Sequence, residues 1–517
     1  MTDADVIVVG AGPAGLMLAA ELRLAGVRPL VLERRPRLGE VPKANGIGGQ
    51  ILELLRYRGL LERLEAAAHG RVHPAPRIPF GEVHLDFAPL GESPLRGLTL
   101  PQPRLERLLA ERAVELGAEI RRGHELVGVG QDEDGVTADV HGPDGTYRVT
   151  ARYLVGCDGG RSRVRELTGI PFPGTTYPEV NRLGQVTVPD SVTSLPDGDL
   201  DVPGVGRVRT GRFTRTDRGV FGFGLLTPEV WLVSTTEDEL SEPDDDAPMA
   251  LAELQESIRR VLGVSFPLGE PIRLSRYHFQ ARQAERYRDG RILLAGDAAH
   301  LFPATGVGLN AGMLDAVNLA WKLAARVQGW APDGLLETYH EERHLAGART
   351  LLHTQAQVAL RRGHDPAAEA LRKVFLELVA DEQPLRRMGA LIAGTDIRYP
   401  MPHPNGHALT GTFAPDLVLR TEEGTTSVAE LLRGARPVLL DLADRPDVRD
   451  TARGWRDRVD VRTAATDHRP ADALLIRPDA HIAWAATADE PAGPALRDAL
   501  AEWFGAPLAA PLASRLS

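Results

Sequence analysis

Cysteine is almost absent from this chain of 517 residues, which holds Cys157 alone. A single thiol excludes an intrachain disulfide, a CxxC redox pair and a thiolate metal cluster, and it fits a reducing compartment. Long apolar runs are missing too, because no stretch approaches the roughly 18 residues that a membrane span needs. The N-terminus MTDADVIVVGAG lacks the basic start and long apolar core of a signal peptide. These absences predict a cytoplasmic protein without a membrane anchor.

Clustered positive charge is the next absence. The 71 acidic residues outnumber the 60 basic ones, the net charge is −11, and no lysine- and arginine-rich block stands out. Nucleic-acid binding is therefore disfavoured. The chain also lacks a GxSxG elbow and HExxH spacing, so we predict neither a serine hydrolase nor a metal site. At about 150 residues per domain, the length predicts two to four globular domains.

The first forty residues carry a dinucleotide-binding pattern. A β-branched run at 5–9 leads into GAGPAG at 10–15, and 16–24 then reads as a helix. Gly10 permits the tight turn, Gly12 lets the backbone approach a pyrophosphate, and Gly15 allows close helix–strand packing. The second strand ends in Glu33, whose carboxylate suits a ribose 2′-hydroxyl and would repel a 2′-phosphate. The pattern therefore predicts FAD or NAD, not NADP, at this site.

Two later segments deliver glycine and aspartate beyond an apolar strand. The first ends in Gly156-Cys157-Asp158-Gly159, and the second in Gly296-Asp297 before a glycine-bearing loop and a helix over 312–327. Ligands in open α/β sheets bind beyond the carboxyl ends of the strands, so we expect all three segments to meet. No second dinucleotide fingerprint occurs, which favours transient NAD(P)H binding.

Together these residues resemble the group A FAD-dependent aromatic hydroxylases, which have the p-hydroxybenzoate hydroxylase fold. The runs 153–165, 315–323 and 475–484 are most similar to bacterial aromatic-polyketide hydroxylases of the angucycline type. The resemblance covers essentially the whole chain. It implies FAD as prosthetic group, NAD(P)H as reductant and O2 as co-substrate. The implied reaction is hydroxylation of a polycyclic aromatic polyketide through a C4a-hydroperoxyflavin, in antibiotic biosynthesis; a homodimer stays open.

The resemblance also implies roles for single residues. Residues 11–14 would line the pyrophosphate, Glu33 would hold the adenosine ribose beside Arg34, and the backbone of Leu126 would contact the adenine side. Gln102 would contact the ribityl–phosphate region and Asp297 would accept from a ribityl hydroxyl. Pro303 would sit over the isoalloxazine edge. The amides of Leu309 and Asn310 would face flavin N1 and O2, where a helix N-terminus stabilises the anionic reduced ring.

Two departures from the family pattern concern this cofactor site. Lys43 stands where many relatives have an arginine near the flavin, and a lysine lacks the planar fork for bidentate contacts. The loop from His300 to Asn310 is one residue shorter than the usual HxxPPxGxxGxN. The predicted cofactor residues are Gly10, Ala11, Gly12, Pro13, Ala14, Gly15, Glu33, Arg34, Lys43, Gln102, Leu126, Asp158, Gly296, Asp297, Pro303, Gly306, Gly308, Leu309 and Asn310.

The domain prediction follows from these patterns. An α/β FAD-binding domain of the glutathione-reductase type, Rossmann-like and split in sequence, covers 1–173 and 274–398. Short β-patterned runs over 174–273 predict an inserted antiparallel β-sheet substrate domain, to which strands near 73–98 would add. The candidate apolar walls for the substrate are Phe221, Phe223, Trp231 and Phe302. Phe302 and Pro303 are expected near the flavin, which itself carries the chemistry, so no side chain is assigned as catalytic.

The end of the chain is expected to form a domain of its own. Helices over 335–392 and a proline-rich linker at 399–406 precede alternating strands and helices. Residues 405–517 resemble the thioredoxin-like C-terminal domain of phenol hydroxylase relatives. This part has no cysteine, so it has no redox role. We expect a structural or subunit-contact role, with the domain dispensable for flavin binding.

Several alternatives to hydroxylation stay open. The same flavin chemistry serves Baeyer–Villiger insertion or another oxidative rearrangement of a polyketide. An FAD dehydrogenase without oxygen insertion is a second alternative. A halogenase is disfavoured because no WxWxIP segment occurs, and a non-enzymatic flavin-binding scaffold because all cofactor segments are present.

Overall fold

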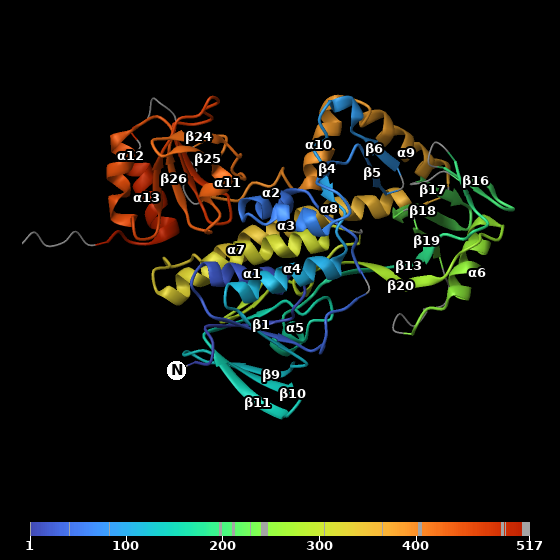
Figure 1. The fold of residues 1–517 in the computed structure, drawn as a ribbon, viewed down its shortest axis with the longest axis horizontal. Coiled ribbons are helices and arrows are strands. Elements are labelled where there is room, and N and C mark those ends of the chain that lie inside the picture. The colour runs from blue at the N-terminus through green and yellow to red at the C-terminus, as the bar shows by residue number, and fades with distance from the viewer. Residues whose placement is uncertain are drawn as a thin grey trace, which may run out of the picture.

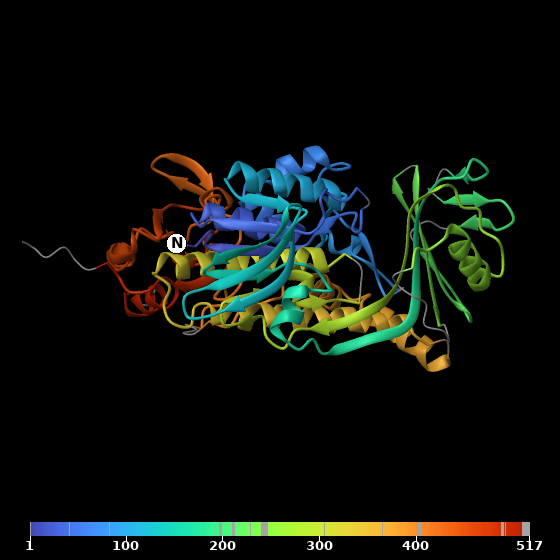
Figure 2. The same cartoon turned by 90° about the horizontal axis from the view of Figure 1, so that it is seen from below.

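The computed structural model describes residues 2–508, apart from 41, 82, 196–198, 209–211, 228, 239–246, 304–305, 364, 402–405, 487–490 and 492. Most of the acidic stretch near residue 241 and the centre of the predicted linker lie outside the described residues. Figure 1 shows an α/β region in the middle, an antiparallel sheet at one end and the C-terminal region at the other. The turned view in Figure 2 keeps this order.

The central region is built on a six-stranded sheet. Its inner strands pair in parallel and are buried along their whole length, which suits their runs of valine, isoleucine and leucine. Neighbouring inner strands of this sheet come from distant parts of the chain and pair in parallel. This arrangement confirms the predicted α/β core. The order is β21 (Arg288–Asp289), β22 (Ile292–Leu294), β12 (Tyr153–Gly156), β1 (Val6–Val9), β2 (Pro29–Glu33) and β8 (Glu119–Arg122).

Helices and a small sheet complete this region. α1 packs against α7 and α4, and a three-stranded antiparallel sheet connects β8 to β12. The helices are α1 (Pro13–Leu24), α2 (Gln50–Tyr57), α3 (Leu61–Ala67), α4 (Gln102–Glu115), α5 (Arg163–Thr168) and α7 (Gly308–Gln328), with the 3₁₀ turn η2 (Gly296–Ala298). The small sheet consists of β9 (Glu125–Gln131), β10 (Val136–Gly142) and β11 (Gly145–Ala151).

A second six-stranded sheet, antiparallel throughout, lies at one end of the molecule. One of its faces packs on α6 (Leu251–Leu262), which presents Leu254, Ile258 and Val261. The first long strand of the sheet, β13, begins at Gly174, and the long strand β20 continues past residue 273 to Gln283. In order it contains β17 (Arg212–Thr216), β18 (Gly219–Thr227), β19 (Val230–Asp238), β13 (Gly174–Thr187), β20 (Pro271–Gln283) and β23 (His300–Leu301), with β14 (Thr193–Ser194), β15 (Leu200–Val202) and β16 (Gly206–Val208) beside it.

The strands near 73–98 do not join this sheet, which corrects the prediction. They form β3–β7–β4 and the hairpin β5–β6, because their apolar side chains pack instead on α8 and α10. The strands of this stretch are β4 (His73–Pro74), β5 (Arg77–Phe80), β6 (Val83–Asp86) and β7 (Arg96–Leu98), with η1 (Ala88–Leu90) between β6 and β7, and their partner β3 (Ile47–Gly48) comes earlier in the chain. The predicted helical stretch is confirmed as α8 (Glu337–Arg361), α9 (Pro366–Leu378) and α10 (Glu382–Ala393). None of the described helices is long and apolar enough to cross a membrane.

The C-terminal region holds a four-stranded mixed sheet in the order β27–β26–β28–β29, with β26 and β27 parallel and the other pairs antiparallel. Its core joins that of the central region, since Trp321 of α7 packs among Trp455, Trp503 and Phe504. The elements are β24 (Val418–Thr421), β25 (Gly424–Ser427), α11 (Val428–Leu431), β26 (Val438–Asp441), α12 (Pro446–Thr451), η3 (Ala452–Trp455), β27 (Asp460–Thr463), β28 (Ala473–Ile476), β29 (Ile482–Ala486) and α13 (Gly493–Phe504). This shared core argues against a dispensable domain.

Candidate functional site

The carboxyl ends of three parallel strands meet at one cavity of about 470 Å³. β1 ends before Gly10, β12 before Cys157 and β22 two residues before Gly296, so the three predicted segments do come together. The predicted residues on the cavity wall are Gly10, Gly12, Pro13, Ala14, Glu33, Arg34, Lys43, Gln102, Leu126, Asp158, Gly296, Asp297, Phe302, Gly306, Gly308 and Leu309.

The glycines of the first turn have three different reasons to be glycine. Gly10 has φ +104°, and a β-carbon there would lie 2.4 Å from the carbonyl oxygen of Cys157. A β-carbon at Gly15 would lie 2.0 Å from the carbonyl oxygen of Gly10. At Gly12 it would meet no described atom within 4 Å, and no described side chain caps the start of α1 there. Open space before an uncapped helix start suits an approaching phosphate.

Glu33 lies at the tip of β2, beside this turn. One carboxylate oxygen accepts from the Ala11 N–H at 2.8 Å, and the other accepts from the N–H of Arg35 at 2.9 Å and from its Nε at 3.1 Å. Burial alone would raise the pKa of Glu33, but these N–H groups and the guanidinium lower it below its usual value. A fixed, ionised acceptor at this strand end suits a ribose hydroxyl.

Asp158 on the cavity wall also organises the segment after β12. Its carboxylate accepts from Ser162 Oγ and from the N–H groups of Arg163 and Val164 at 2.7 and 3.1 Å, at the start of α5. The neighbouring Cys157 thiol is buried, and burial raises its pKa well above the usual value. This thiol is therefore protonated and behaves as a small apolar group.

Asp297 lines the same cavity and lies in η2, next to Gly296. Its side chain is open to the cavity while protein surrounds the rest of it, and this enclosure raises its pKa, although His300 and Lys43 oppose the shift. Gly296 has φ +64°, and a β-carbon there would lie 3.1 Å from the β-carbon of Ala14. The second acceptor is thus held close to the first turn by residues that leave little room.

The loop after β23 leads into α7 along the cavity. Gly306, Gly308 and Leu309 line it, residues 304–305 lie outside the described residues, and no described side chain caps α7. Asn310 is turned away from the wall, since its amide donates to the carbonyl oxygen of Gly306 at 3.0 Å and accepts from the N–H of Gly48. The uncapped start of α7 offers backbone N–H groups to an anionic ring edge.

Four predicted cofactor residues are not on the cavity wall: Ala11, Gly15, Pro303 and Asn310. Ala11 and Gly15 act through the backbone of the first turn, as described above. Wall residues that the sequence analysis did not single out include Arg35, Glu106, His124, Glu125, Cys157, Arg161, Arg163 and Leu301. Of these residues, Glu106 could have been predicted from its spacing, because it follows Gln102 by one helical turn. Its carboxylate accepts from the Gln102 amide at 2.7 Å.

Three of the four predicted substrate walls lie elsewhere. Phe221, Phe223 and Trp231 are at most 5% exposed and pack with Phe266 between the antiparallel sheet and α6. Side chains packed against α6 cannot also face the cavity, so the structure gives this prediction no support. Phe302 alone lines the cavity, where its ring stacks on His300 at 4.6 Å between centroids.

The opposite face of the same sheet contacts the segment that leads onto the cavity wall at Lys43. Gln185 and Arg273 pair across β13 and β20, and both side chains reach the carbonyl oxygen of Pro42, Arg273 at 2.6 Å. Pro42 precedes Lys43 and Ala44 on the cavity wall. Alternation along the strands puts Asn181 and its cross-strand partner Tyr277 on this face too. The face thus carries amide, guanidinium and phenol groups, and it reaches the cavity wall only through Pro42, because none of these four side chains lines the cavity itself.

Comparison with known proteins agrees with this geometry. Residues 3–354 match the family described as FAD binding domain, and residues 407–507 match the family described as aromatic-ring hydroxylase, C-terminal. The chain is 42% identical over 516 residues to the 12-dehydrotetracycline 5-monooxygenase/anhydrotetracycline 6-monooxygenase of Streptomyces rimosus, covering 97% of this chain and 99% of that one.

Two other similar proteins are named for different activities. The crystal structure of CabE, an aromatic hydroxylase from angucycline biosynthesis, is 39% identical, with a TM-score of 0.87 over 98% of this chain and all of that one. The dialkyldecalin synthase of Streptomyces rugosporus is 39% identical over 508 residues, 97% of this chain and 98% of that one.

Proposed function

This chain belongs to the FAD-binding aromatic-ring hydroxylase family and is a flavoprotein monooxygenase, and from that premise we propose that it hydroxylates a polycyclic aromatic polyketide. NAD(P)H is the proposed reductant and O2 the co-substrate. One observation carries the proposal: the first turn, Glu33 and Asp297 come from separate segments and meet around one cavity. The names of the relatives, which refer to tetracycline and angucycline chemistry, support the substrate class.

The residues on the cavity wall fit FAD. The start of α1 and the open space at Gly12 would take the pyrophosphate, Glu33 the adenosine ribose and Asp297 a ribityl hydroxyl. The start of α7 would lie beside the anionic edge of the reduced ring. When bound, FAD supplies the redox chemistry, accepting a hydride from NAD(P)H and activating O2. The chain itself binds and orients the cofactor and the substrate, and it excludes water from the cavity.

We propose that the substrate lies on the face of the antiparallel sheet opposite α6, and that this face, with Phe302, sets substrate selectivity. The Asn181–Tyr277 and Gln185–Arg273 pairs support this, because they offer hydrogen bonds to phenol and ketone oxygens next to an aromatic surface. The rings of Tyr277 and Phe279 pack edge to face, with their centroids 5.7 Å apart. The guanidinium of Arg361 lies 5.2 Å from the centroid of the Phe279 ring. These rings replace Phe221, Phe223 and Trp231 as the proposed apolar walls.

The domain limits and the C-terminal fold are proposals as well. We propose a split flavin domain over 1–173 and 274–398, a substrate domain near 174–283, and a thioredoxin-like domain from 405. The last is supported by the β27–β26–β28–β29 order, with one parallel pair followed by a hairpin between α12 and α13. A homodimer and a cytoplasmic location stay predictions.

The rival reactions share the cavity. Baeyer–Villiger insertion would differ only in how the substrate is held. A reaction without oxygen insertion gains some support from the relative named as a dialkyldecalin synthase. A test of function must therefore follow both electron transfer and the fate of oxygen.

We predict that bound substrate accelerates reduction of the flavin by NAD(P)H at least about 10-fold, a barrier change of about 1.4 kcal/mol. The chain has a single dinucleotide fingerprint, so NAD(P)H would meet the flavin only briefly. Gly306 and Gly308 on the wall leave room for the ring to adjust to substrate. Anaerobic stopped-flow mixing with and without an anhydrotetracycline-type or angucyclinone-type polyketide measures both rates. Equal rates would contradict substrate-gated reduction.

A further inference from the structure

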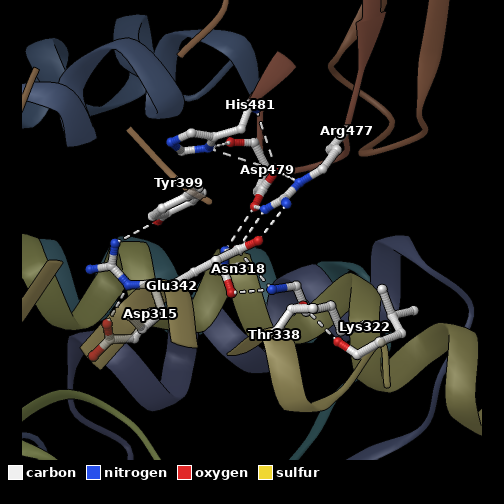
Figure 3. Close-up of polar contacts among 11 residues, drawn as sticks. Asp315, Asn318, Lys322, Thr338, Glu342, Tyr399, Arg477, Asp479 and His481 are labelled. Carbon is white, nitrogen blue, oxygen red and sulfur yellow. Dashed lines mark hydrogen bonds and ion pairs between the residues drawn. The ribbon is translucent and has the colours of Figure 1, made fainter. Parts of the chain in front are cut away.

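Arg343 on α8 is a buried cation, 3% exposed, whose guanidinium serves three acceptors. Its Nε donates to Asp315 at 2.7 Å, one terminal nitrogen donates to the Tyr399 hydroxyl at 2.7 Å, and the other donates to the carbonyl oxygen of Ala311 at 3.2 Å. Figure 3 shows Asp315 and Tyr399 with their polar contacts. The planar fork thus joins α7, α8 and the segment that leads to the C-terminal region.

Asp315 carries this contact on to the cavity wall. Its second carboxylate oxygen accepts from the N–H of Gly296 at 2.9 Å and from His300 Nε2 at 2.7 Å. Gly296 is the residue before Asp297, and the ring of His300 stacks on Phe302. Burial alone would raise the pKa of Asp315, but His300 and Arg343 lower it below its usual value, so this carboxylate is ionised. One charged group therefore contacts the 296–302 turn at Gly296 and at His300.

Ala311 carries the contact to a second part of the wall. It lies in the first turn of α7, between Leu309 and Gly312, which both line the cavity. Arg343 therefore holds two separate parts of the cavity wall, one directly and one through Asp315, although it does not line the cavity itself.

Tyr399 extends the same contacts to the C-terminal region. Its ring stacks on His481 at 4.1 Å between centroids, and the guanidinium of Arg477 lies 5.5 Å from it. Arg477 in turn binds Glu342, the neighbour of Arg343 on α8, at 2.6 Å (Figure 3). The position of the Tyr399 hydroxyl is thus set by residues of the C-terminal region.

We propose that Arg343 is a positioning residue for the flavin site, held in place by Tyr399 and acting through Asp315 and Ala311. The inference rests on the proposed function only in taking the cavity to be the FAD site. It assigns the C-terminal region a role at a distance: it keeps Asp297, Phe302 and the start of α7 in the geometry that the flavin meets.

The test compares two buried tyrosines whose rings both stack on residues of the C-terminal region, Tyr399 on His481 and Tyr57 on Phe413. Tyr399→Phe removes only the hydroxyl that Arg343 contacts. Tyr57→Phe is the matched control, because the Tyr57 hydroxyl donates to the Ala414 carbonyl oxygen at 2.8 Å and does not touch Arg343. For each full-length variant, flavin fluorescence titration of the apoprotein gives the Kd for FAD, visible circular dichroism reports the environment of the bound ring, and urea unfolding gives stability.

We expect Tyr399→Phe to raise the Kd for FAD about 5- to 10-fold and to change the flavin circular dichroism. Arg343→Lys, which keeps the charge and loses the fork, should do the same. Tyr57→Phe should lower the urea midpoint while leaving Kd and spectrum as in the wild type. An unchanged Kd in Tyr399→Phe, or an equal rise in both tyrosine variants, would overturn the proposal. A wild-type chain that bound no FAD would overturn both proposals, whereas absence of hydroxylated product would overturn the proposed function alone.

Discussion

Replacing Arg477 by alanine is expected to lower the free energy of unfolding by about 3–5 kcal/mol. Arg477 is fully buried, binds both oxygens of Glu342 and both of Asp479, and lies 4.4 Å from the Trp503 ring. Arg477 and Lys322 hold the pKa of Glu342 at about 2 although burial alone would raise it. Without the guanidinium, two carboxylates lose their main counter-charge in a place that water does not reach.

Denaturant unfolding of the full chain measures this loss, with Arg497→Ala as the control. Arg497 lies on the exposed side of α13, so its removal should change stability by less than about 0.5 kcal/mol. Similar unfolding curves for Arg477→Ala and Arg497→Ala would show that the buried network contributes nothing to stability.

Replacing Asp297 by alanine is expected to weaken FAD binding by about 1–3 kcal/mol, or roughly 5- to 150-fold in Kd. The carboxyl group lines the same cavity as Glu33, and protein encloses it elsewhere. A ribityl hydroxyl that donates to it would lose its partner without gaining water. The alanine variant should therefore purify with little flavin.

The ratio of flavin absorbance to protein absorbance measures this depletion directly. Asp297→Asn keeps a carbonyl acceptor and should retain more flavin than the alanine variant. Asp217→Ala, in the exposed turn between β17 and β18, is the control and should purify as yellow as the wild type. Full flavin occupancy in Asp297→Ala would mean that this segment does not hold the cofactor.

The parts of the site that the sequence predicted are those with strict local demands. At Gly10 and Gly15 the backbone leaves no room for a β-carbon, so only glycine fits and the pattern is readable. Glu33 and Asp297 follow short buried strands, and strand ends are easy to locate from apolar runs. Their meeting in space follows from the rule that parallel strands present their carboxyl ends at one edge.

Side-chain direction in the antiparallel sheet was not predictable in the same way. Alternation shows that Phe221, Phe223 and Trp231 belong to packed faces, but it does not say which face a later helix covers. α6 follows β19 in the chain and covers the face with these aromatic rings, which leaves Tyr277 and Arg273 on the other. The strands near 73–98 have the same difficulty, because their partners, α8 and α10, come more than 200 residues later.

The importance of the C-terminal region was underestimated for a related reason. Asp315, Asn318 and Lys322 interrupt an otherwise apolar helix at helical spacing, and this pattern signals a polar contact across one face. Asn318 donates to Asp479, which lies 161 residues further along the chain, and Lys322 shares Glu342 of α8 with Arg477. Sequence spacing alone does not pair groups so far apart, whereas the folded chain brings Asn318 and Asp479 to 2.9 Å of one another.

The measurement that tests the proposed function most directly is mass spectrometry of the product formed under ¹⁸O₂. The purified chain is given FAD, NAD(P)H and an aromatic polyketide of the tetracycline or angucycline class. Hydroxylation predicts one ¹⁸O atom in a new phenol or alcohol, with one equivalent of NAD(P)H consumed. One ¹⁸O atom in a lactone would instead indicate Baeyer–Villiger insertion. A converted substrate without any ¹⁸O would contradict the proposal.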